Sequence, residues 1–144
     1  MSNDGWVWQH EYCIPSKAGA GQCVVEDVLA QLQQHQWDDK DVFGIHLAVE
    51  EALVNAIKHG NKLDMSKQVT VNCSMSPALF RIAITDEGEG FDLDQVPDPT
   101  DEDNLDAPSG RGIMLMRSFM SRVLFNDRGN HVVLEKDREA VPAD

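Results

Sequence analysis

The sequence has little basic charge and no long hydrophobic run. Only 12 of its 144 residues are lysine or arginine, against 25 acids, so the formal net charge is -13. A surface with this balance repels phosphate backbones, and we therefore expect no direct binding to nucleic acid. It favours instead a partner that carries a basic patch. Because the longest apolar runs are only a few residues, we also expect no membrane-spanning segment.

Cysteine is scarce as well. Three cysteines are present, and no two of them have the spacing of a metal or redox motif. This usage suits a reducing compartment, so we expect the cytoplasm, with each thiol buried as a small apolar side chain. The stretch 1–9 is polar and contains two tryptophans, unlike a signal peptide.

The length and composition predict one domain over residues 1–144. We expect frayed ends at 1–5 and 137–144. Hydrophobic periodicity then predicts three helices, around 24–32, over 42–57 and from 110 onward. The expected strands cover residues 6–14, 69–75, 79–85, 123–125 and 131–135. The last four strands pair as two antiparallel hairpins, and the long middle helix ends at Gly60 and Asn61, which tolerate a left-handed cap.

The first motif that points to chemistry is EEALVNAIKHGN, on the long middle helix. Glu51, Asn55 and His59 are four residues apart, so they form one polar stripe. A carboxylate and an amide oxygen one turn apart are suited to orient a hydroxyl and hold a hard cation. The alternative is an ordinary solvent-exposed face, which periodicity alone favours.

The second motif is TDEGEGFD, directly after an apolar strand. Asp86 shares its strand face with Phe80 and Ile82, a face that points into the core. A carboxylate there needs a partner, because burying it unpaired is costly. Gly88 and Gly90 permit a ligand to approach the backbone closely. A plain turn with an acid at the strand end is the alternative.

The third motif is SGRGIML, at the start of the last helix. Gly110 and Gly112 flank Arg111, so free N–H groups, the helix dipole and a guanidinium meet there. This combination is typical of an anion site, although a flexible joint has the same composition. The preceding segment 91–109 is rich in aspartate and proline and lacks periodicity. A loop of that length is usually functional or disordered.

In this order the three motifs resemble the N, G1 and G2 boxes of the Bergerat-fold ATPases. The stretches EALVNAIKHG, ITDEGEGFD and SGRGIMLMRSFMSRV, with PDPT between the last two, are similar to the serine-kinase anti-sigma factors of bacterial sporulation and stress switches. The resemblance covers nearly the whole chain. It implies a two-layer α/β (α+β) sandwich, with a mixed, mostly antiparallel sheet packed against three helices. ATP lies between the layers, under a flexible lid at 91–109.

The resemblance also implies residue roles. Asp86 accepts a hydrogen bond from the adenine amino group, Asn55 ligates Mg²⁺, and Glu51 orients or deprotonates the attacking serine. The remaining residues of the implied ATP/ADP site are Lys58, His59, Gly88, Gly90, Gly110, Arg111 and Gly112. Lys58 and the backbone of 110–112 contact the phosphates.

Three functional hypotheses follow. The leading one is an ATP-binding serine/threonine kinase that phosphorylates an anti-anti-sigma-like protein, sequesters a regulatory partner such as a sigma factor, or does both. The second is a binding module that responds to nucleotide without catalysis, and the third is a trans-acting histidine-kinase-like domain. Gln22 and Pro108 stand where the sporulation kinase has arginines, a departure that bears on the partner. The tryptophans at 6 and 8 pack on an edge strand or form a homodimer contact, and we favour packing.

Overall fold

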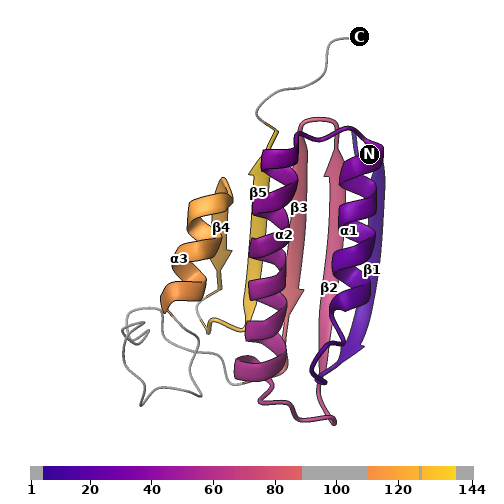
Figure 1. The fold of residues 1–144 in the computed structure, drawn as a ribbon. Coiled ribbons are helices and arrows are strands. Elements are labelled where there is room, and N and C mark those ends of the chain that lie inside the picture. Colours follow the sequence, from indigo (N-terminus) through magenta and orange to yellow (C-terminus); the bar gives the residue numbers. More distant parts are fainter. Residues whose placement is uncertain (1–4, 89–109, 127, 139–144) are drawn as a thin grey trace.

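The computed structural model describes residues 5–88, 110–126 and 128–138, and Figure 1 shows their arrangement. The strands are β1 (Trp8–Pro15), β2 (Gln68–Ser76), β3 (Leu79–Thr85), β4 (Arg122–Phe125) and β5 (His131–Asp137). The helices are α1 (Gln22–Gln34), α2 (Asp39–Val54), the π-helix η1 (Asn55–Gly60) and α3 (Gly110–Phe119). The expected lid at 91–109 and the glycine at position 90 lie outside the described residues.

The five strands form one sheet in the order β1-β2-β3-β5-β4. Both expected hairpins are confirmed, β2 with β3 and β4 with β5. The two-layer α/β fold is confirmed too, but every pairing in the described sheet is antiparallel, so it is not mixed. β5 reaches Asp137, two residues beyond its expected end.

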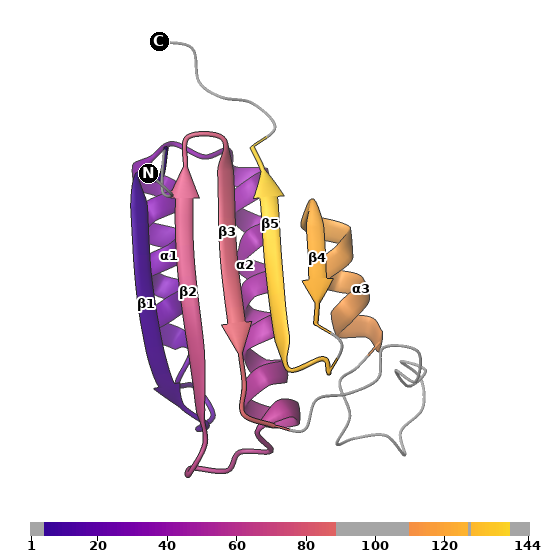
Figure 2. The same ribbon diagram turned by 180° about the vertical axis from the view of Figure 1, so that it is seen from behind.

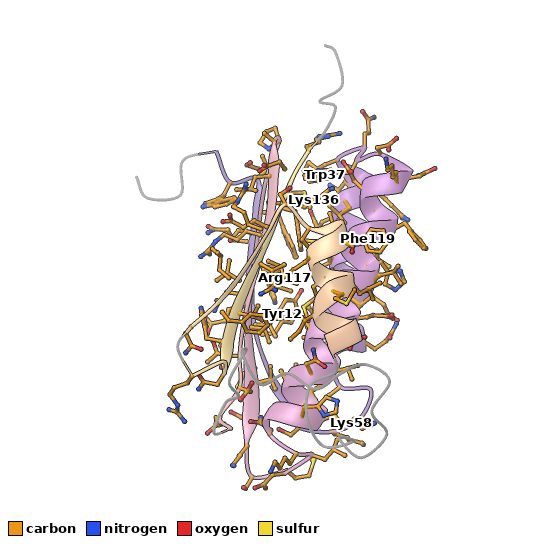
Figure 3. All side chains as sticks on the ribbon, turned by 90° about the vertical axis from the view of Figure 1, so that its left-hand side faces the viewer. Tyr12, Trp37, Lys58, Arg117, Phe119 and Lys136 are labelled. Carbon is orange, nitrogen blue, oxygen red and sulfur yellow. The ribbon has the colours of Figure 1, made fainter. Side chains whose placement is uncertain are left out.

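All the described helices lie on one face of the sheet, as Figures 1 and 2 show from opposite sides. Alternation along the strands explains this, because every second residue of a strand points to the same face. In β2 the buried set is Val69, Val71, Cys73 and Met75. The registers align it with Phe80, Ile82 and Ile84 of β3, and all of these side chains belong to the hydrophobic core. Figure 3 shows side chains between the sheet and the helices. The opposite face of the sheet has no helix over it in Figure 2.

Helix α2 begins at Asp39, three residues before the expected range 42–57, and it also ends differently. The Asp38 side chain accepts a hydrogen bond from the Lys40 N–H at 3.3 Å, as an N-cap does. At its other end the helix continues into the π-helix η1, closed by the Asn61 N–H donating to the Ala56 oxygen at 2.9 Å. Asn61 has a φ of -87°, so the left-handed cap expected there is wrong. The left-handed residues are the next two, 62 and 63.

The cysteine expectation is wrong in two of three cases. Cys73 is buried, whereas Cys13 and Cys23 are exposed. The Cys13 thiol donates to the Gln68 Oε1 atom at 2.9 Å, and the Cys23 thiol donates to the Ala20 oxygen at 3.7 Å. Trp8 packs against the core, as expected. Within the described ranges, no helix is both long and apolar enough to cross a membrane.

Candidate functional site

A narrow pocket opens where the end of α2 and η1 meet the sheet and the β4–β5 turn. Its walls include Asn55, His59, Asp86, Asn130 and His131. The pocket volume of about 30 Å³ equals the space of roughly two water molecules.

Asp86 is the charged group at the base of this pocket. It is 7% exposed, and its Oδ1 atom accepts a hydrogen bond from the Gly88 N–H at 2.8 Å. Burial raises the pKa of the carboxyl from 3.8 to about 6, against the opposing effects of that hydrogen bond and of Arg128 and Lys67. The backbone N–H of Asp86 donates to the Asn130 oxygen at 2.9 Å. The residue is therefore rigidly held, with a carboxylate that gains from a hydrogen-bond donor.

Two glycines explain how the carboxylate fits beside the helix layer. A Cβ atom at Gly60 would lie 2.4 Å from the Asp86 Oδ2 atom, and one at Gly88 would lie 1.9 Å from the Gly60 oxygen. Contacts this short exclude any side chain at either position. The end of η1 and the loop after β3 are thus in direct backbone contact, which brings the first and second motifs together.

The π-helix carries two buried polar atoms without a partner. The Asn55 Oδ1 and His59 Nδ1 atoms have no hydrogen bond among the described residues, and both residues line the pocket. Buried polar groups are nearly always satisfied, so unsatisfied ones are strong indicators of a ligand. π-helical turns are also frequent at functional sites. The free amide oxygen of Asn55 fits a Mg²⁺ ligand, because Mg²⁺ prefers oxygen.

Glu51 lies in a second hollow rather than in this pocket. That hollow, of about 320 Å³, lies between α2 and the start of α1, with Gly21, Gln22 and Val54 among its walls. The carboxylate packs against the start of α3: a Cβ atom at Gly112 would lie 2.5 Å from the Glu51 Oε2 atom. The structure therefore brings Asn55, His59 and Asp86 together and sets Glu51 beside them, where it faces both neighbouring helices.

The structure describes some of the other expected site residues but not all of them. Lys58 is exposed on η1, and Figure 3 places it at the opposite end of the helix layer from Trp37. Gly110 is the first residue of α3, where the third motif predicted a helix start. The Arg111 side chain, like Gly90, lies outside the described residues.

The sequence reasoning missed the wall that the β4–β5 turn contributes. Phe125, Gly129, Asn130 and His131 all line the pocket. The Asn126 side-chain oxygen shapes this turn by accepting hydrogen bonds from the N–H groups of Gly129 and Asn130, at 2.7 and 3.0 Å. The segment NDRGN was recognisable as a turn, but its position against the second motif depends on the sheet order.

Comparison with known families places this geometry in context. The model of the histidine kinase-like ATPase domain matches residues 17–136. The chain therefore belongs to the histidine kinase-like ATPase domain family, as the three motifs indicated.

Within this family the chain is similar to anti-sigma factors. An anti-sigma F factor of Clostridium perfringens (strain ATCC 13124) is 31% identical over 103 residues, covering 67% of this chain and 73% of the relative. The serine-protein kinase RsbW of Bacillus subtilis is 29% identical over 103 residues, covering 67% of this chain and 64% of the relative. The RsbW of Oceanobacillus iheyensis is 22% identical, but covers 89% of this chain and 83% of its own length.

A solved structure agrees with the fold. The structure of the RsbU and RsbW domains of Rv1364c from Mycobacterium tuberculosis superposes with a TM-score of 0.62 at 14% identity, covering 92% of this chain. The present chain spans 32% of that longer chain. At this identity the likeness establishes the shared fold.

Proposed function

We propose that this protein binds ATP and ADP with Mg²⁺ and transfers the γ-phosphoryl group of ATP to a serine or threonine of a protein partner. The observation that carries the proposal is the convergence of three groups in one pocket. A buried carboxylate, Asp86, lies with the Asn55 amide oxygen and the His59 Nδ1 atom, neither of which has a hydrogen-bond partner within the part of the chain that the structure describes. The similarity to serine-protein kinases and anti-sigma factors supports the same function.

Each residue has a role that its surroundings support. Asp86 accepts a hydrogen bond from the adenine amino group, because its Oδ1 atom already receives the Gly88 N–H and a second donor offsets the cost of its burial. Asn55 supplies its free oxygen to Mg²⁺. Bound Mg-ATP provides the phosphoryl group, and phosphoryl transfer depends mainly on positioning and charge neutralisation.

Glu51 orients the acceptor hydroxyl or takes its proton. The carboxylate is half-buried and borders the hollow between α1 and α2, which gives an acceptor segment access from outside. Gln22, which stands where the sporulation kinase has an arginine, lies on the rim of this hollow. The substitution therefore falls where a partner would make contact. We propose that the exposed cation of Lys58 and the backbone of 110–112 contact the phosphates.

The partners follow from the relatives and from charge. The anti-sigma relatives suggest that the acceptor is an anti-anti-sigma-like protein and that a sigma factor is sequestered. The net charge of -13 suits a partner with a basic patch. We place this switch in the cytoplasm.

Labelled ATP tests the proposal. The protein is incubated with Mg²⁺ and candidate partner proteins that contain an acceptor serine. Wild-type protein is expected to label one of them. Glu51→Ala is expected to keep ATP affinity and to lower the transfer rate by about 10²–10⁴, whereas Asn55→Ala is expected to lose both. Glu11→Ala, which removes an exposed carboxylate on β1 outside both hollows, is the matched control and is expected to transfer at the wild-type rate.

Two outcomes overturn parts of this proposal. If the protein changes its affinity for a partner with nucleotide but labels none, it is a nucleotide-responsive binding module and not a kinase. If Glu51→Ala transfers as fast as wild type, another residue serves as the base.

A further inference from the structure

Asn61 connects the two walls of the nucleotide pocket. The residue follows η1 directly and is 1% exposed. Its backbone N–H closes the π-helix by donating to the Ala56 oxygen at 2.9 Å. Its side-chain Oδ1 atom accepts a hydrogen bond from the Glu87 N–H at 2.8 Å. One residue therefore binds both the helix that carries Asn55 and the loop that carries Asp86.

The remaining side-chain atoms of Asn61 anchor this link to the sheet. The Nδ2 atom donates to the Ser16 Oγ atom at 2.8 Å and to the Gln68 oxygen at 3.0 Å. Ser16 is also buried, and its hydroxyl donates to the Lys67 oxygen at 2.7 Å. Because the Glu87 N–H is only a donor, the amide oxygen of Asn61 must face it. The network thus fixes the orientation of the side chain.

The loop is also held at Asp86, whose N–H donates to the Asn130 oxygen at 2.9 Å, and by two hydrogen bonds further along. The Glu87 side chain accepts a hydrogen bond from the Gln68 N–H, and Arg128 donates to the Gly88 oxygen at 3.3 Å. The contact between Glu87 and Gln68 is exposed, so water competes for it, whereas the contact between Arg128 and the Gly88 oxygen is half-buried. Glu87 lies between Asp86 and Gly88, whose N–H donates to the Asp86 carboxylate. The hydrogen bond from the Glu87 N–H to Asn61 therefore restrains both neighbours of Glu87, the Asp86 carboxylate and the Gly88 N–H that donates to it.

We propose that Asn61 is a positioning residue for recognition of the nucleotide base: it holds the Asp86 loop against the π-helix through the Glu87 N–H. The inference rests on the proposed function, in which Asp86 contacts adenine. Adenine presents an amino donor where guanine presents a carbonyl acceptor, so a well-placed carboxylate favours ADP over GDP. Loss of the Asn61 hydrogen bond lets the carboxylate move, which reduces this preference.

Titration calorimetry with ADP and with GDP tests the inference, using Asn61→Ala and Asn61→Ser. The second variant keeps a polar group in the site. Ser16→Ala is the matched control, because it removes a buried partner of the same side chain without touching Glu87. A hydrogen bond of this kind corresponds to roughly a threefold to tenfold change in affinity. We expect both Asn61 variants to weaken ADP by that factor and to leave GDP unchanged, while Ser16→Ala lowers the unfolding temperature alone.

The ratio of ADP affinity to GDP affinity distinguishes a positioning role of Asn61 from a general loss of stability. If the Asn61 variants weaken ADP and GDP equally, or if Ser16→Ala weakens ADP as much as they do, the role of Asn61 is structural and the inference is wrong. If wild-type protein does not prefer ADP over GDP, the contact between Asp86 and adenine fails instead. The proposed function and the inference are thus tested by different samples in one experiment.

Discussion

Replacing Asp86 by asparagine should weaken nucleotide binding while stabilising the free protein. The carboxylate is buried, and one of its oxygen atoms already accepts the Gly88 N–H at 2.8 Å. An asparagine oxygen can keep that bond, but its NH₂ group then faces the adenine amino group, donor against donor. A hydrogen bond to a charged group contributes about 1.5–3 kcal/mol, so we expect ADP affinity to fall by roughly one to two decades.

The same substitution, Asp86→Asn, should increase the free energy of unfolding of the nucleotide-free protein. The pKa of Asp86 rises from 3.8 to about 6 on folding, so the unfolded chain releases this proton more readily than the folded one. The carboxyl therefore makes the folded state less stable as the pH rises from about 4 to 6. The difference corresponds to about 3 kcal/mol before solvent screening, and we expect about 1–2 kcal/mol after it. Asparagine removes this cost at pH 8.

Two measurements on the same samples check the reasoning. Calorimetry with Mg-ADP gives the affinity, and urea unfolding without nucleotide at pH 8 gives the stability. Wild-type protein is the reference for both. Unchanged ADP affinity in the variant would refute the adenine contact. Weaker binding together with lower stability would instead indicate a damaged fold.

The remaining predictions concern the same site. Binding of uncharged adenosine to wild-type protein should weaken as the pH falls below about 6, because Asp86 then gains a proton; a flat profile from pH 5 to 8 in calorimetry would contradict this. Gly88→Ala should abolish ADP binding and destabilise the protein by several kcal/mol, about 3 or more, since its Cβ atom would lie 1.9 Å from the Gly60 oxygen; chemical denaturation and calorimetry measure both effects. Gly112→Ala should displace the Glu51 carboxylate, 2.5 Å from the added Cβ atom, and slow phosphoryl transfer at saturating Mg-ATP by about tenfold or more, as the labelled-ATP assay measures.

The sequence alone predicted the layers of the fold and three residues that line the pocket, Asn55, His59 and Asp86. Alternation in 69–75 and 79–85 predicted the central hairpin, since side chains of a strand point to opposite faces. The same rule placed Asp86 on the core face, where the structure finds it buried. The apolar spacing of 42–57 predicted the long helix. These features depend on neighbours in the chain, which is why local patterns were sufficient.

Only the tertiary structure decided how these parts form a pocket. The helix continues after Val54 as a π-helix. Asn55 and His59 line the pocket, while Glu51 borders the hollow beside α1. No local pattern announces this turn, because its closing residue, Asn61, is held by partners at positions 16, 68 and 87. The β4–β5 turn likewise reaches the site only because β5 pairs with β3. The physical reason is the same in each case: the contacts join residues far apart in the sequence, and the sheet order sets which of them meet.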